Sequence, residues 1–224
     1  MNRVKSLLYL TIFAITLFLS GCRKEQPISG TVQSNHFVQV YVEPKDFELR
    51  QLSGVENAIQ ARFTGTTFEC RPSNTKFYEY AKLFNDFSFT GYVLPFDDKA
   101  LTEPLTSVKI VCDKDFDATH KAGSNLGDVI MFCATSPYEF IQSGYKKGPY
   151  TYPDYWKSLV MNQGRGYKAI EVLAKDVNKN NTRMLYPIFH LYFKKKPATS
   201  GEYLFTVTIK IKDVEMVKQI YYTF

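Results

Sequence analysis

The sequence predicts a mainly β protein, an antiparallel β-sandwich of immunoglobulin-like type with a few short helices in its connections. In the clearest segment, Tyr203–Ile211, apolar residues alternate with Thr and Lys, the pattern of a strand with one buried face. Further apolar runs of strand length recur along the chain. The 18 Phe and 16 Tyr supply enough apolar surface for a sizeable core and exclude a disordered chain.

Several strands are expected before and after this segment. The chain is expected to turn at Asp213–Glu215, and Met216–Phe224 is expected to return as the second strand of a C-terminal hairpin. Earlier strands are expected at residues 37–42, around Ile59–Phe63, around Val108–Cys112 and at Ile188–Phe193.

Helical signals are short. Phe77–Phe84 has apolar residues at helical spacing. Ser136-Pro137-Tyr138-Glu139 is a capping box with proline at the first helical position, and Gly144 closes this helix. Asp154–Gly164 predicts a further capped helix that carries Trp156. Ile170–Val177 fits either a strand or a helix, and the sequence leaves it open.

The N-terminus has the pattern of a targeting segment. Arg3 and Lys5 precede the almost wholly apolar run Leu7–Leu19, which is shorter than the roughly 20 residues that span a bilayer. The sequence Leu19-Ser20-Gly21-Cys22 follows and resembles the lipobox of bacterial lipoproteins. A cysteine that ends a plain signal peptide by chance is the alternative interpretation.

The lipobox resemblance implies three parts. Residues 1–21 are a signal peptide, residues 22–35 are a lipidated cysteine with a flexible tether, and residues 36–224 form a single β-rich domain. Cys22 would carry diacylglycerol on its thiol, and two or three acyl chains hold a protein stably on a membrane. We therefore expect a lipid-anchored protein of the cell envelope, on the outer membrane. Either the periplasmic or the surface face of that membrane is compatible with the sequence. Lys24-Glu25 resembles the basic-acidic export signals of Bacteroidetes surface lipoproteins.

Charge argues against a nucleic-acid partner. Loss of residues 1–21 lowers the formal charge from +6 to +4. A nucleic-acid-binding protein concentrates its basic residues on one face, whereas here they are spread thinly apart from Lys194-Lys195-Lys196. That triplet fits the solvated end of a strand; a position near anionic lipid headgroups is the alternative.

Three cysteines remain once Cys22 is lipidated. Cys70, Cys112 and Cys133 follow strand-like runs, where a free thiol packs well as a small apolar group. An oxidising compartment also allows one disulfide, so the sequence favours buried thiols without deciding any pair. Cysteine and histidine spacing does not suggest zinc, and we expect no cofactor and no metal.

Residues 113–117 form an aspartate-rich segment with turn character. Asp113, Asp115 and Asp117 match the opening of a calcium loop, but Ala118 and Ser124 stand where an EF-hand needs Gly and Glu. Aspartates that bond their own backbone are favoured over a looser calcium site, which stays open.

The same region carries a family resemblance. The strand Val108–Val111 leads into Asp113-Lys114-Asp115-Phe116-Asp117-Ala118, and Ala122-Gly123-Ser124-Asn125-Leu126 with Asp128 follows. This pattern resembles a family of uncharacterised Bacteroidetes lipoproteins, which share the strand, both motifs and a C-terminal hairpin. Lys121 stands where many relatives have proline. The resemblance implies a compact, largely β extracytoplasmic domain and no activity, so it transfers no catalytic residue.

The candidate classes of function follow from the catalytic and binding motifs that the sequence contains or lacks. No segment indicates a nucleophile with its base, so no catalytic residues are assigned. Tyrosines on a Gly- and Pro-containing loop suggest a ligand-binding patch, either for stacking on sugar rings or as cover for the sandwich edge; they are Tyr145, Tyr150, Tyr152 and Tyr155. The leading hypothesis is a non-catalytic binding module for a glycan or an envelope protein. An envelope hydrolase and a structural subunit of an envelope complex are the alternatives.

Overall fold

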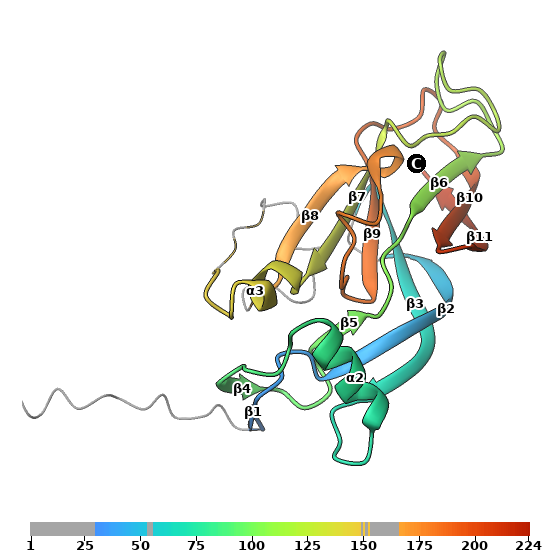
Figure 1. Cartoon of the computed structure of the whole chain (residues 1–224). Coiled ribbons are helices and arrows are strands. Elements are labelled where there is room, and N and C mark those ends of the chain that lie inside the picture. Colours follow the sequence, from blue (N-terminus) through green and yellow to red (C-terminus); the bar gives the residue numbers. More distant parts are fainter. Residues whose placement is uncertain (1–29, 53–55, 149, 151, 153–165) are drawn as a thin grey trace, which may run out of the picture. The chain divides into compact units, whose positions relative to one another are not determined.

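The computed structural model describes residues 30–52, 56–148, 150, 152 and 166–224 (Figure 1). These residues are mainly β, as the sequence predicts. None of the helices in these ranges is long and apolar enough to cross a membrane. The predicted helix at Asp154–Gly164 lies outside the described residues.

The larger sheet has six strands in the order β5-β2-β3-β9-β7-β8. All neighbours are antiparallel except β2 and β5, which pair in parallel. Its strands are β2 (Val40–Gln51), β3 (Ala58–Glu69), β5 (Lys99–Leu101), β7 (Ile130–Ser136), β8 (Lys168–Leu173) and β9 (Ile188–Phe193).

The smaller sheet has three strands in the order β11-β10-β6. They are β6 (Ser107–Cys112), β10 (Glu202–Ile211) and β11 (Val214–Thr223). The predicted C-terminal hairpin is confirmed, with Tyr203 opposite Tyr222 and Ile211 opposite Val214. The turn is slightly earlier than expected, because Lys212 adopts a φ of 53° and reverses the chain there.

The two sheets bury their facing sides in one core. Inward residues of both sheets join in it, including Phe132 and Phe189 from the large sheet and Ile110 and Val207 from the small one. Phe193 of β9 meets Phe205 of β10 with ring centroids 5.0 Å apart. The two-layer packing follows from the period-two pattern of the strands. The immunoglobulin-like detail of the expected fold stays a prediction.

A bulge bends the long strand β2. Its register with β3 shifts between Pro44 and Asp46, opposite Gly65. A Cβ atom at Gly65 would lie 2.0 Å from the carbonyl oxygen of Glu43. This close approach of two backbones requires glycine at position 65.

A second core lies under α2 (Thr75–Leu83). Val40 and Val42 face the first core, and Tyr41 between them points to the opposite face, where its ring lies 5.3 Å from that of Phe77. Asn74 caps α2 by accepting a hydrogen bond from the backbone N–H of Phe77. The helix expected at Phe77–Phe84 is therefore confirmed.

We call residues 32–38 and 71–98 the α2 lobe. It contains α2 and the small ribbon of β1 (Val32–Ser34) and β4 (Gly91–Val93). Strand β2 begins at Val40, later than the expected residue 37. The reason is that the N–H groups of Phe37 and Val38 donate to the buried Asp86 carboxylate, not to a neighbouring strand.

Two further segments differ from simple expectation. Helix α3 spans Tyr138–Gln142, and the Ser136 hydroxyl accepts from the Tyr138 N–H at 3.1 Å. Glu139 does not complete the expected capping box, because it pairs with Lys168.

The stretch Ile170–Val177, which the sequence left open, contains both a strand and a helix. Strand β8 ends at Leu173, and a 3-10 helix follows at Ala174–Asp176.

Candidate ligand-binding groove beside β8

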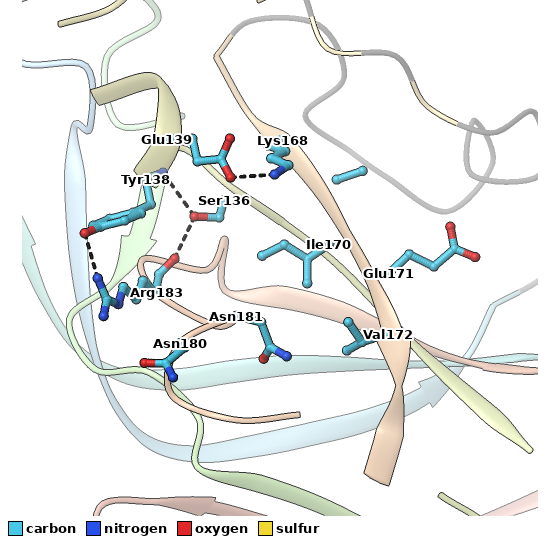
Figure 2. A pocket seen from close by; sticks show the side chains of 11 residues that line it. Ser136, Tyr138, Glu139, Lys168, Ile170, Glu171, Val172, Asn180, Asn181 and Arg183 are labelled. Atoms are coloured by element: carbon cyan, nitrogen blue, oxygen red, sulfur yellow. Dashed lines mark hydrogen bonds and ion pairs between the residues drawn. The ribbon is translucent and has the colours of Figure 1, made fainter. Parts of the chain in front are cut away.

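A groove of about 340 Å³ runs between β8 and the loop at residues 178–183 (Figure 2). The end of β7 and the start of α3 close one end of it. It is lined by Ser136, Tyr138, Glu139, Lys168, Ala169, Ile170, Glu171, Val172, Asn180, Asn181 and Arg183. Ligand pockets typically begin at about this volume.

The floor of the groove is apolar. Ile170 and Val172 point toward the loop at 178–183, whereas Glu171 between them points the other way (Figure 2). This alternation is the period of a β-strand. Both side chains are only partly buried against the first core, and β8 is the outermost strand of its sheet. The floor therefore keeps apolar surface available to a ligand.

Arg183 and Tyr138 form one side of the groove. An Arg183 guanidinium N–H donates to the Tyr138 hydroxyl at 2.8 Å, and the Arg183 Cζ lies 5.3 Å from the centroid of the Tyr138 ring. The Ser136 hydroxyl donates to the Arg183 carbonyl at 2.6 Å. These contacts hold a cationic, planar donor group and an aromatic ring at fixed positions.

The Glu139 carboxylate and Lys168 lie at the upper end of the groove in Figure 2, and Lys147 also approaches this carboxylate. The Nζ of Lys168 lies 2.5 Å from a Glu139 carboxylate oxygen, and the Nζ of Lys147 lies 3.9 Å from the other. All three side chains are substantially exposed. Exposed ion pairs of this kind contribute little to stability, so their groups can exchange partners when a ligand binds.

The loop at 178–183 supplies amides. Asn181 accepts from the Asn178 N–H and donates to the Asp176 carbonyl, both at 3.0 Å. The buried hydroxyl of Thr182 lies 2.8 Å from the carbonyl oxygens of both Leu105 and Asn178, and its single proton is shared between these two acceptors. The loop is thus fixed from below, and it presents the exposed side chain of Asn180 at the groove.

This combination of groups suits binding by hydrogen bonds over an apolar floor. Amide, guanidinium and carboxylate groups can each bond adjacent hydroxyls, while aliphatic side chains contact C–H faces. Among the lining residues that the structure describes there is no histidine. The Ser136 hydroxyl is engaged with a backbone carbonyl, which does not activate it as a nucleophile.

The described tyrosines of the predicted patch, Tyr145, Tyr150 and Tyr152, do not line this groove. The Tyr145 hydroxyl donates to the Asp86 carboxylate at 2.9 Å, and its ring lies 5.3 Å from that of Phe89. The Tyr152 hydroxyl donates to the Tyr167 carbonyl. Tyr150 is partly buried, and Tyr155 lies outside the described residues.

The groove uses a different tyrosine, Tyr138. Its proximity to Arg183 depends on a contact across 45 positions of sequence. The only sequence signal near it is the Ser136–Glu139 capping pattern, which indicates a helix start and not a binding site. Ligand binding by Tyr145, Tyr150, Tyr152 and Tyr155 stays a prediction; the hydroxyls of Tyr145 and Tyr152 each have an internal hydrogen-bond partner.

The aspartate-rich turn bonds its own backbone and its neighbours. Asp113 accepts from the Leu204 N–H, Asp115 from the Ala122 N–H and Asp117 from the Thr119 N–H, at 2.8 to 2.9 Å. Each carboxylate is therefore directed to a different partner. Within the described ranges, no group of three or more His, Cys, Asp or Glu residues is arranged to hold a metal ion.

The three described cysteines are free thiols. Cys133 belongs to a cross-strand row on the outer face of the large sheet, since the register places five residues in line: Arg50, Gln60, His190, Cys133 and Glu171. The Gln60 amide donates to Nε2 of His190 at 2.9 Å. This row could not be found from the sequence, because it joins five strands.

Cys133 and His190, in the middle of the row, are both uncharged at neutral pH. Burial, and secondarily Glu171, raises the pKa of the Cys133 thiol far above its usual value. Burial, and secondarily Arg50, lowers the pKa of His190 to about 4. A neutral imidazole beside a protonated thiol is the opposite of an activated cysteine pair, so this row packs the sheet.

In comparisons with known proteins, no family model, no curated protein and no solved structure matches the chain.

Proposed function

We propose that the protein is a lipid-anchored binding protein of the cell envelope, which takes a short glycan in the groove beside β8. The Leu19–Cys22 motif supports the anchor. The observation that carries the binding role is the convergence of Asn180, Arg183 and Glu139 on an apolar floor. An outer-membrane location is part of the same proposal and rests on the resemblance to Bacteroidetes lipoproteins.

The physical argument for a glycan is the match of surfaces. A sugar ring offers an aliphatic face and a rim of hydroxyls that both donate and accept hydrogen bonds. The side chains of Ile170 and Val172 suit the aliphatic face of the sugar, and the exposed Asn180 amide with the Arg183 guanidinium suits its hydroxyls. The exposed ion pair of Glu139 with Lys168 can supply further hydrogen-bond acceptors and donors. Since both charged groups are present, a ligand that binds there does not leave a single charge buried without a partner.

A glycan-binding assay tests this role. The detergent-solubilised lipoprotein is titrated calorimetrically against a panel of envelope and dietary oligosaccharides. Asn180→Ala and Arg183→Ala should each weaken binding about tenfold, because each removes hydrogen bonds worth about 1 to 1.5 kcal/mol. Lys179→Ala is the matched control, since Lys179 is exposed on the same loop and does not line the groove. A panel without binding, or equal loss in the control, contradicts the proposal.

A polypeptide partner is the second candidate, and one observation favours it. Strand β8 is the outermost strand of the six-stranded sheet, and an extended peptide can add to such an edge through backbone hydrogen bonds. A photo-crosslinking amino acid at Glu171 would report it by capturing an envelope protein in cells. The same probe at Lys179 should capture much less.

An envelope hydrolase is a further alternative. It predicts that an oligosaccharide bound in the groove is cleaved on prolonged incubation, and that Glu139→Gln stops the cleavage. Intact ligand recovered after incubation with the wild-type protein argues for binding alone.

A further inference from the structure

Large exposed apolar side chains are concentrated in two places. Among the residues that the structure describes, ten are large, apolar and exposed. Three of them lie on β11, and seven lie in the α2 lobe: Val32, Tyr78, Leu83, Phe87, Tyr92, Leu94 and Phe96. Leu83 is 68% exposed and Phe87 is 53% exposed. Such clusters mark interaction surfaces on soluble domains.

The exposed side chains of the α2 lobe could turn inward only if buried neighbouring residues turned outward. Phe87 directly follows Asp86, which is fully buried and turned inward by four hydrogen bonds. Tyr92 precedes the buried Val93 in β4, so the strand period sends Tyr92 outward. The outward direction of Phe87 and Tyr92 is therefore set by the inward direction of their neighbours.

Cationic groups accompany the apolar side chains. The Arg71 guanidinium carbon lies 5.2 Å from the centroid of the Phe96 ring. Lys82 lies in the last turn of α2, next to Leu83. Aromatic residues beside Arg and Lys are typical of surfaces that lie in the headgroup region of a bilayer.

The chain leading to β1 limits how far this lobe can be from the lipid. Only ten residue steps separate Cys22 from Val32, the first residue of β1. Even fully extended, such a segment reaches no more than about 35 Å. Strand β1 pairs directly with β4, with Gln33 opposite Tyr92. Strand β11 lies at the other side of the domain from β1 and β4 (Figure 1).

We infer that the α2 lobe is the membrane-facing surface of this protein, with Phe87, Tyr92, Leu94 and Phe96 inserted in the interfacial region of the bilayer. The inference rests on the lipid anchor of the proposed function. It adds an orientation to that anchor: the α2 lobe rests on the lipid.

Quenching by brominated lipid tests the orientation independently of native acylation. The chain from residue 22 onward carries an N-terminal histidine tag and is held on phosphatidylcholine–phosphatidylglycerol vesicles through a nickel-chelating lipid. In a Trp156→Phe background, which removes the single native tryptophan, Phe87→Trp or Phe96→Trp provides the probe. Tyr221→Trp on β11 is the matched control, because Tyr221 is 61% exposed.

We expect brominated lipid to quench both lobe probes at least twofold more than the β11 probe. Equal quenching at both places overturns the inference. So does a concentration-dependent dimer that protects the lobe probes without lipid, since the covering surface would then be a second copy. Mass spectrometry of the native N-terminus tests acylation separately, so failure of the anchor and failure of the orientation are distinguishable.

A partition measurement keeps the test independent of the tryptophan variants. The triple substitution Phe87→Ser, Leu94→Ser and Phe96→Ser should lower partition of the untagged chain into the same vesicles about tenfold. Val214→Ser, Val217→Ser and Tyr221→Ser together form the control, because these exposed side chains lie on β11. Equal partition of the two triple variants contradicts a membrane-facing lobe.

Discussion

The Tyr145 hydroxyl donates a hydrogen bond of 2.9 Å to the Asp86 carboxylate, across 59 positions of sequence. The same carboxylate accepts from the N–H groups of Phe37 and Val38 and from the Tyr41 hydroxyl. One buried acid thus joins the entry to β2, the end of α2 and the loop after α3. Burial raises the pKa of Asp86, and the hydrogen bonds from Phe37, Val38 and Tyr145 oppose that shift only in part.

Asp86→Ala should destabilise the domain by on the order of 3 kcal/mol, because it leaves two backbone N–H groups and two hydroxyls buried without their acceptor. Tyr145→Phe removes one donor and should cost about 1 kcal/mol. Urea unfolding followed by circular dichroism measures both. Asp213→Ala, in the exposed hairpin turn, should change the free energy of unfolding by less than about 0.5 kcal/mol. Similar losses in all three variants would contradict a central role for Asp86.

Gly65→Ala should destabilise the bent β2–β3 pair by more than about 2 kcal/mol. The added Cβ would lie 2.0 Å from the Glu43 carbonyl oxygen, and a backbone atom cannot move aside as a flexible side chain can. Thermal unfolding measures the change. Thr64→Ala, at the exposed neighbouring position, is the control and should unfold close to the wild-type temperature. An unchanged midpoint for Gly65→Ala would show that the bulge relaxes freely.

Stability should depend on pH through His120. Its Nδ1 lies 2.9 Å from Asp117 and its Nε2 lies 3.0 Å from Asp128, while Lys195 also faces Asp117. The hydrogen bond to Asp117, followed by that to Asp128, raises the pKa of His120 above its usual value.

Because the folded-state pKa is the higher one, the stabilisation is complete below the unfolded pKa of about 6.5 and is lost as pH rises through the folded pKa. His120 should therefore lower the free energy of unfolding as pH rises from about 6.5 through its raised folded-state pKa, and His120→Gln should remove this contribution. His190 has the opposite effect, because its folded-state pKa of about 4 is below the unfolded value of about 6.5, so its stabilisation is lost as pH falls below about 6.5. An identical slope in the variant and the wild type would remove His120 as the cause.

Cys22→Ala should abolish palmitate labelling and move the protein from the membrane fraction to the soluble fraction. The reason is that two or three acyl chains are required for stable attachment. Metabolic labelling and cell fractionation measure both effects. Cys70→Ala should keep the label, which shows that the loss is specific to position 22. Persistent labelling of Cys22→Ala would refute the anchor.

The sequence predicts the strands well where one face is buried. The alternation in Tyr203–Ile211 specifies which side chains face the core, and the hairpin follows from the turn residues after it. It predicts Phe37–Val42 less well, because the N–H groups of Phe37 and Val38 bond a side chain from residue 86. Local patterns carry no information about such a distant acceptor.

The tyrosine-rich loop shows the same limit at the candidate site. Composition alone made Tyr145 a candidate ligand-binding residue, yet its hydroxyl is bonded to the buried Asp86. The groove is instead built from Tyr138, Ile170 and Arg183, which come from three separate segments. None of these three is distinctive in its own stretch of sequence.

The sequence by itself determined the strand periodicity, the C-terminal hairpin and the expectation of a lipid anchor, since each depends on residues close together in the chain. Tertiary structure decided where the polar side chains meet, including the Asp86 network, the outer-face row at His190 and the groove beside β8. Hydrogen bonding and burial depend on distance in space, and folding brings together residues that no local pattern connects.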